Sequence, residues 1–360
     1  MWDLRRISLF GQNDNSGSDR GLGRLHADSI LQNEDNTNTM AKMQFGVLLP
    51  HFGKEASPSR IIDGSKMCEE LGFHSVWVRD HLIWHPHGME KSGLKFVEPI
   101  VTLSAVAAVT RRIILGIAVL VPVRWPLKVS QDLASLSYIA GGRVIAGMGL
   151  GFNPAELATV GLRIEDRVEI LRETVEIARL IWKENNASYK GKIFSFENVT
   201  IEPKPAEPIP IFCGGSTRAA IRRAAEYCDG WIPGRVPMAT FDDRIRYLRQ
   251  LTDRKITLGN IPITRIDKDR RKARASINVE ALAESSEGSS HWIKPPSGKF
   301  QTIEDLEGLL IVGNPDDCAA EIEKFRTRGV EHLVFDLRLQ YDRYEESLEL
   351  IGKELLPRFQ

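Results

Sequence analysis

The fold is decided by the stretch "RIILGIAVLVPVRWPLKVSQDLASLSYIAGGRVIAGMGL", residues 112–150. Its first part, 112–121, is a nearly continuous apolar run, which is typical of a parallel strand buried on both faces. A helix is predicted over 126–140 and a second apolar strand over 142–150. A strand, a helix and a further strand in this order form the repeating unit of a parallel sheet.

The same alternation continues on both sides of this stretch. The clearest helix follows it, because apolar residues recur every three or four positions from Ile164 to Trp182. A small hairpin is predicted over 189–205. Eight strands, each followed by a helix, predict a (β/α)8 TIM barrel over residues 43–360 rather than a doubly wound sheet. The predicted strands lie at 43–50, 73–80, 112–121, 142–150, 209–215, 229–233, 255–264 and 331–339.

Composition excludes several classes of partner. The 48 basic and 48 acidic side chains cancel, so no global field attracts nucleic acid or an anionic membrane. No apolar run approaches the roughly 20 residues that span a bilayer. The cysteines form no CxxC pair, which predicts buried, reduced thiols in a cytoplasmic protein rather than disulfides or a metal site. They are Cys68, Cys213, Cys228 and Cys318.

Residues 1–42 differ from the rest of the chain. They are rich in Asn, Asp, Ser and Gly and show no sustained period, which predicts a disordered N-terminal extension. It is not a signal peptide, because no apolar segment follows the early arginines. The segment is either an arm with a transient interaction role or the result of a start placed upstream of Met40 or Met43, and we favour the second.

Polar side chains follow the apolar part of the predicted strand 73–80. Asp80 ends this strand and His81 comes next. The reactive face of such a barrel lies at the C-terminal ends of its strands, so His81 is a candidate general acid or base whose tautomer Asp80 fixes. A hydrogen-bonded polar strand end is the alternative. His85 and His87 are interpreted as part of a solvated loop, and no metal site is predicted.

Two glycine-rich segments also follow predicted strands. Gly147 and Gly149 suggest a dinucleotide fingerprint, but Phe152 stands where the third glycine is needed, so that site is not predicted. These glycines either admit a flat ring or allow tight packing. From Gly214 to Thr217, backbone N–H groups and hydroxyls converge at the start of a helix, which predicts an anion cradle suited to phosphate. An ordinary capped helix is the alternative.

From Met43 onward the chain resembles the luciferase-like monooxygenase superfamily, whose members are flavin- and deazaflavin-dependent (β/α)8 barrels. The resemblance covers about 320 residues, and its segments occur in the family's order. They are "FGVLLP", "ELGFHSVWVRDHL", the stretch 112–150 with its continuation "GFNPAE", "IPIFCGGSTRAAIRRAAEYCDGW" and "VGNPDDCAAEIEKF". The Asp-His pair followed by Trp84 is similar to the branch that uses the deazaflavin coenzyme F420.

The resemblance implies roles for individual residues. His81 is expected at the hydride-transfer centre, with Asp80 and Trp84 lining the site. A non-prolyl cis peptide is expected between Ala118 and Val119, behind the ring of the coenzyme. The remaining expected contacts are to phosphate from Gly214, Gly215, Thr217 and Arg218, and to the ring or ribityl chain from Gly149 and Asn153.

One departure from the family pattern concerns the substrate. Sugar-phosphate dehydrogenases of this branch carry a catalytic glutamate where this chain has Leu150, so an oxidation that depends on that acid is not expected. Glu156 lies six residues further on and is not assumed to replace it. Trp84, Trp125 and Phe52 are expected beside a pocket at the barrel mouth, with core packing as the alternative for each.

We therefore expect an F420-dependent oxidoreductase that transfers a hydride between the coenzyme and a small organic substrate. His81, oriented by Asp80, would exchange the accompanying proton. The alternative is an FMN-dependent monooxygenase of the alkanal, alkane or sulfonate type, which a flavin reductase would supply with reduced flavin. A second alternative is a non-catalytic flavin-binding protein. The family resemblance also implies a homodimer.

Overall fold

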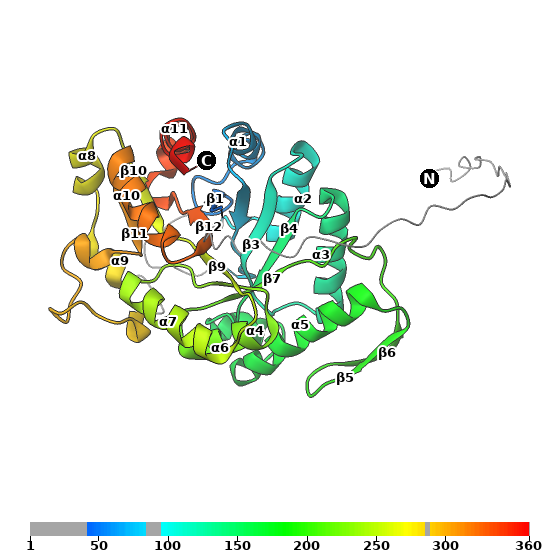
Figure 1. Cartoon of the computed structure of the whole chain (residues 1–360). Coiled ribbons are helices and arrows are strands. Elements are labelled where there is room, and N and C mark those ends of the chain that lie inside the picture. Colours follow the sequence, from blue (N-terminus) through cyan, green and yellow to red (C-terminus); the bar gives the residue numbers. More distant parts are fainter. Residues whose placement is uncertain (1–41, 84–94, 285–288, 360) are drawn as a thin grey trace, which may run out of the picture. The chain divides into compact units, whose positions relative to one another are not determined.

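The computed structural model describes residues 42–83, 95–284 and 289–359. Eight parallel strands close into a barrel (Figure 1). Each barrel strand pairs with the next one along the chain, and the last pairs with the first. The predicted (β/α)8 barrel is confirmed, and each of the eight predicted strands contributes to it. The barrel strands are β1 (Gln44–Leu48), β2 (Ser75–Val78), β3 (Ile114–Leu120), β4 (Val144–Met148), β7 (Ile211–Gly214), β8 (Gly230–Ile232), β9 (Thr257–Asn260) and β12 (Val330–Phe335).

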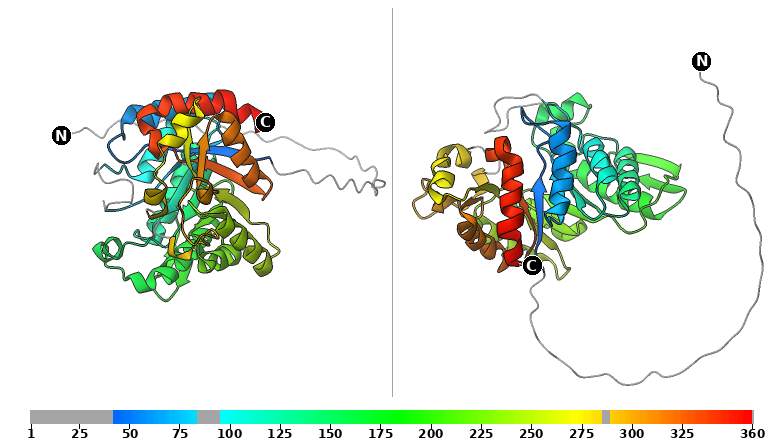
Figure 2. Two further views of the ribbon diagram at one scale, coloured as in Figure 1. Left: turned by 90° about the vertical axis from the view of Figure 1, so that its left-hand side faces the viewer. Right: turned by 90° about the horizontal axis from the view of Figure 1, so that it is seen from above.

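Helices surround this barrel. Several of them begin with proline, whose missing N–H costs nothing in a first turn and whose φ is already helical. Figure 2 shows the C-terminal helix α11 alongside α1. The last helix of the barrel therefore packs against the first. The helices are α1 (Pro58–Glu70), α2 (Pro99–Val109), α3 (Pro126–Ala140), α4 (Pro154–Thr159), α5 (Arg167–Lys183), α6 (Arg218–Tyr227), α7 (Met238–Leu251), α8 (Arg270–Ala275), α9 (Val279–Glu284), α10 (Pro315–Arg326) and α11 (Tyr344–Leu350).

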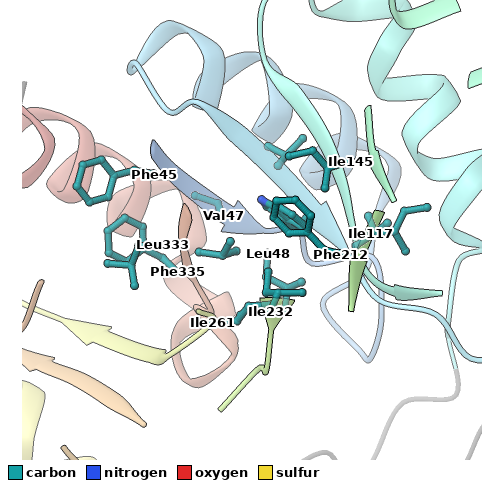
Figure 3. Close-up of a cluster of buried hydrophobic side chains, with 14 of the residues drawn as sticks. Phe45, Val47, Leu48, Ile117, Ile145, Phe212, Ile232, Ile261, Leu333 and Phe335 are labelled. Atoms are coloured by element: carbon teal, nitrogen blue, oxygen red, sulfur yellow. The ribbon is translucent and has the colours of Figure 1, made fainter. Parts of the chain in front are cut away.

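Large buried side chains pack inside the barrel and between the barrel and its helices, so the barrel is a packed core and not a pore (Figure 3). Trp77 of β2 is fully buried, and its indole N–H donates to Ser75 Oγ (2.8 Å). Gly46 and Gly116 on the two neighbouring strands make room for this indole, because a Cβ at Gly116 would lie 2.2 Å from Trp77 Cδ2. This packing leaves no room for a ligand around Trp77, and in such barrels ligand sites lie at the C-terminal ends of the strands.

The predicted hairpin is present outside the barrel as β5 (Ala187–Lys190) and β6 (Ser195–Val199) (Figure 1). The prediction of one strand over 255–264 is wrong in part. β9 ends at Asn260, and β10 (Ile263–Ile266) begins a separate two-stranded sheet with β11 (Leu310–Gly313). Pro262 lies between β9 and β10 and has no N–H to donate to the barrel ladder.

Two findings concern the expectations about membranes and the N-terminal extension. Within the described ranges, no helix is both long enough and apolar enough to cross a bilayer. The predicted extension 1–42 lies, apart from Lys42, outside the described residues.

Candidate active site

A cavity of about 450 Å³ opens at the C-terminal ends of the barrel strands. Such a volume lies within the range of small-molecule and cofactor sites. Most of the site residues predicted from the sequence line it. These are Asp80, His81, Ala118, Val119, Gly149, Gly214, Gly215 and Thr217.

The end of β3 forms one wall of the cavity. The peptide between Ala118 and Val119 is cis, as expected, and the register of β3 on β4 shifts at this point. A Cβ at Gly149 would lie 2.4 Å from Val119 Cγ2, and one at Gly214 would lie 2.8 Å from Val119 Cγ1. These glycines therefore leave room for the Val119 side chain, as the tight-packing alternative for Gly149 predicts. Val119 in turn presents an apolar surface to the cavity.

The turn from β7 into α6 forms a second wall. Gly215 has φ +102°, a backbone conformation that favours glycine. Its carbonyl accepts from the indole of Trp231 (2.9 Å), and the carbonyl of Ser216 accepts from Arg244 Nε (2.9 Å). Thr217 caps α6, since its Oγ1 accepts from Ala220 N (3.1 Å). Held in this way, the turn leaves the first N–H groups of α6 and the helix dipole available for an anion.

Arg223 complements this helix N-terminus. It lies further along α6 and lines the cavity. Its Nε is buried and has no hydrogen-bond partner among the described residues. Buried donors are normally satisfied, so an oxygen of a bound ligand would complete this site. The walls thus fit a flat ring beside Val119 and a phosphate at α6, which are the parts of a flavin-type coenzyme.

Two predicted cofactor residues do not reach the cavity, and a third cannot be placed. Arg218 is exposed and pairs with Asp243 (2.9 Å), because its position on α6 faces α7 rather than the barrel mouth. Asn153 is the N-cap of α4, where its side chain accepts from Ala155 N (3.0 Å). Trp84, like His85 and His87, lies outside the described residues.

Neither of the other two aromatic residues expected at the pocket lines the cavity directly. Trp125 is half exposed and packs edge-on against Phe194, with ring centroids 5.0 Å apart. Phe52 is buried beneath the guanidinium of Arg79. Over the described ranges, no group of three or more His, Cys, Asp or Glu side chains is arranged to hold a metal ion.

His81 is held by a residue that the sequence did not identify. Its Nδ1 lies 3.4 Å from Oε2 of Glu156, a fully buried side chain of α4. The rings of Phe96 and Phe152 contact the imidazole edge-on. The backbone N–H of Leu82 donates to the other oxygen of Glu156.

The charge of Glu156 decides the tautomer of His81. Burial raises the pKa of Glu156, but the hydrogen bonds from His81 and Leu82 outweigh it, so the pKa is lowered overall. An ionised carboxylate only accepts hydrogen bonds, so Nδ1 of His81 must carry the hydrogen. In the neutral ring, Nε2 is then the basic nitrogen. The sequence spacing gave no hint of this pair, because its members are 75 residues apart.

The expected pairing of Asp80 with His81 is wrong. The buried carboxylate of Asp80 accepts from Val121 N (2.9 Å) and, through both oxygens, from the guanidinium of Arg124 (2.6 and 2.9 Å). Arg124 also donates to Glu98 (3.0 Å). Asp80 therefore ties the end of β2 to the segment after β3, and it positions the cavity wall rather than the imidazole.

We expect Asp80→Ala to lower the free energy of unfolding by about 3 kcal/mol, because it leaves Arg124 without its buried partner. Urea unfolding followed by tryptophan fluorescence measures the change. Asp63→Ala is the matched control, since Asp63 is 69% exposed and pairs with Lys66 at the surface, where a change of at most about 0.5 kcal/mol is expected. Equal stabilities of the two variants would show that the Asp80 pair has no structural role.

The structure brings further residues to the cavity that the sequence analysis missed. Apart from Arg223, which lies within α6, each follows a barrel strand or belongs to a loop over the barrel mouth. Position after a strand could therefore have identified most of them. His291 is one of them, and its carbonyl accepts from Arg244 (3.2 Å). The others are Arg79, Arg223, Arg235, Asp336 and Arg338.

Comparison with known proteins agrees with this geometry. A family model described as luciferase-like monooxygenase matches residues 43–332. An F420-dependent glucose-6-phosphate dehydrogenase of Nakamurella multipartita is 29% identical over 333 residues, which cover 85% of this chain and 96% of the relative.

Two solved structures share the fold. One is a coenzyme F420-dependent tetrahydromethanopterin reductase of Methanopyrus kandleri, with a TM-score of 0.68 and 20% identity over 89% of this chain and 100% of its own. The other is the oxygenating constituent of 3,6-diketocamphane monooxygenase of Pseudomonas putida in complex with FMN, with a TM-score of 0.70 and 18% identity over 89% of this chain and 99% of its own. At these identities, the structural likeness shows the barrel fold alone.

Proposed function

The chain belongs to the luciferase-like monooxygenase family, and on that premise we propose that it is an F420-dependent oxidoreductase. It transfers a hydride between the deazaflavin coenzyme and a small organic substrate. The observation that carries this proposal is the cavity itself. It places His81, oriented by an ionised Glu156, in the same chamber as the Val119 wall and the N-terminus of α6.

Each wall has a distinct task in this proposal. F420, when bound, supplies the hydride acceptor or donor, and the protein supplies binding, orientation and proton exchange. The N–H groups at the start of α6 and Arg223 hold the phosphate, and Val119 supports the ring. His81 accepts through Nε2 the proton that leaves the substrate hydroxyl during oxidation, or returns it during reduction.

The cavity departs from the sugar-phosphate dehydrogenases at one wall. Leu150, partly exposed, lines the cavity where those enzymes carry a glutamate. An apolar side chain cannot exchange a proton, so His81 has to perform that step with help from Glu156. We therefore propose a substrate whose oxidation or reduction needs a single acid–base group.

Titration with the two candidate coenzymes tests the proposal. We expect oxidised F420 to bind the purified full chain at least tenfold more tightly than FMN, as measured by the change in coenzyme fluorescence. Gly149→Ala serves as a site control. Its Cβ would displace Val119, from which it would lie 2.4 Å away, so coenzyme binding should weaken. Selective FMN binding would instead support the FMN-dependent monooxygenase with a reductase partner, and binding without turnover of any substrate would support a non-catalytic binding protein.

We further propose that the enzyme is a cytoplasmic homodimer. The four cysteines are free and buried, which fits a reducing compartment. The dimer is proposed from the family resemblance, and light scattering of the purified protein would measure it.

A further inference from the structure

A short segment before β11 contributes to the cavity wall. This strap, residues 290–293, places His291 in the cavity lining. Trp292, the next residue, is 5% exposed and packs edge-on against Phe300, with ring centroids 5.7 Å apart. His291 itself is exposed, and its imidazole forms no hydrogen bond with the described part of the chain. The strap is thus anchored by its tryptophan and presents the imidazole to a ligand in the cavity.

Helix α7 holds the strap through two side chains that are four residues apart. Thr240 Oγ1 accepts from Ile293 N (2.8 Å), and Arg244 Nη2 donates to the carbonyl of His291 (3.2 Å). Residues at this spacing lie on the same face of a helix. Both side chains are buried. The backbone of the strap is therefore fixed at His291 and again at Ile293.

Arg244 also holds the turn that leads into α6. Its Nε donates to the carbonyl of Ser216 (2.9 Å), and Ser216 directly precedes the capping residue Thr217. Its Nη1 pairs with Asp243, which balances the charge. Nε and Nη2 are neighbouring donors of one planar guanidinium, so they hold the carbonyls of Ser216 and His291 close together. One side chain thus joins the strap to the turn at which a phosphate would bind.

The strap adds a donor from a second direction. The backbone N–H groups at the start of α6 and Arg223 belong to one helix, whereas His291 comes from a segment after α9. A phosphate presents several acceptor oxygens. An imidazole carries an N–H in either neutral tautomer and in the protonated form. His291 can therefore donate to a phosphate oxygen that α6 does not reach.

We propose that His291 is a further phosphate-binding residue of the coenzyme site, and that Arg244 is the residue that positions it. The inference rests on the proposed function in one respect, because it assigns the group bound at α6 to the phosphate of the coenzyme. The imidazole donates from a ring nitrogen to a phosphate oxygen, and the charge of the acceptor strengthens this hydrogen bond. Arg244 does not contact the coenzyme and acts by keeping the strap beside the turn.

Three deazaflavins titrated against the full chain test the role of His291. They are F420, the deazaflavin riboside that lacks the phosphate, and the 5′-phosphate of that riboside, and the change in fluorescence gives each dissociation constant. We expect His291→Ala to weaken F420 and the riboside phosphate by about tenfold, as for one hydrogen bond to a charged group, and to leave the riboside within about twofold. Since His291 is exposed, the melting temperature without ligand should not change.

Ile293→Ala is the matched control in the strap. The side chain of Ile293 is 41% exposed and is not part of the described cavity lining. Its backbone N–H, which binds Thr240, is kept in the variant. The affinities for all three deazaflavins should therefore stay within about twofold of the wild type.

Arg244→Lys tests the positioning role. Lysine keeps the charge but lacks the paired N–H donors of a guanidinium. We expect weaker binding of F420 and of the riboside phosphate, with the riboside little changed. When Arg244→Lys is combined with His291→Ala, the loss should be smaller than the product of the two single losses, because both changes act in part through the same imidazole.

Four results decide against parts of this assignment. The role of His291 is overturned if His291→Ala weakens all three ligands alike, weakens none of them, or weakens F420 but not the riboside phosphate. Independent losses in the double variant would overturn the positioning role of Arg244. If the wild type binds FMN and not F420, the proposed function fails alone, and the same variants titrated with FMN and riboflavin decide on His291. A chain that binds neither coenzyme would overturn both proposals.

Discussion

Replacing His81 by alanine is expected to lower turnover by about 10²- to 10⁴-fold, the range over which a general acid–base group contributes. The affinity for F420 should stay within about threefold of the wild type, because the coenzyme is held by Val119 and the start of α6. Steady-state kinetics, with the substrate found by screening, measures turnover, and the fluorescence titration measures coenzyme affinity.

A second histidine variant tests whether the loss of turnover is specific to His81 or follows from the loss of any imidazole. His74 lies before β2, at the other end of the barrel, where its Nδ1 accepts from Phe45 N (3.2 Å). His74→Asn should leave turnover within about twofold. A His81→Ala enzyme that keeps more than about a tenth of its turnover would remove His81 from the proposed chemistry.

The second large effect is expected for Glu156→Gln. The amide can still accept from Leu82 N–H, but it no longer places a negative charge beside Nδ1 of His81. We expect kcat to fall by roughly 10- to 100-fold with KM little changed, since the imidazole loses the group that selects its tautomer. Kinetics across the range from about pH 6 to about pH 9 measures this, where a free glutamate is ionised.

A conservative variant distinguishes positioning from structural damage. Glu156→Asp keeps a negative charge beside Nδ1 of His81, so it should recover part of the kcat that Glu156→Gln loses. The lowered pKa of Glu156 means that its stabilising contribution is present above the usual pKa of a glutamate and is lost as the pH falls through the lowered value. Throughout the assay range, the wild-type enzyme therefore keeps this carboxylate charged.

Glu165→Gln provides the control for this variant. Glu165 is exposed before α5, so the same substitution there should not alter kcat. If Glu156→Asp and Glu156→Gln lowered kcat equally, Glu156 would be a packing residue and not a positioning residue.

The barrel itself was predictable because its evidence is local. The apolar runs of β3 and β4 and the helical period of α5 depend on neighbours within a few residues. Proline stands at the first position of α1, α3 and α10, which is a local signal for the start of a helix. The prediction of a single strand over 255–264 was wrong because an apolar run does not reveal whether its second half stays in the barrel.

The candidate site was predictable only in part. Position after a strand identified His81 and the turn before α6, since the architecture brings all such ends to one face. It did not show that Arg218 faces α7 while Arg223 faces the cavity, because that difference depends on how α6 is rotated against β7. Nor did it show that the carboxylate of Asp80 forms an ion pair with Arg124.

The sequence by itself determined the class of fold, the face that carries the site and the family, because alternation, caps and motif order are properties of short segments. Only the tertiary structure decided which groups meet on that face. Glu156 joins His81 across 75 residues, and Arg79 approaches Asp336 from strands at opposite ends of the chain. Closure of the barrel brings these residues together, and their burial at the barrel mouth strengthens the electrostatic interactions between their charges.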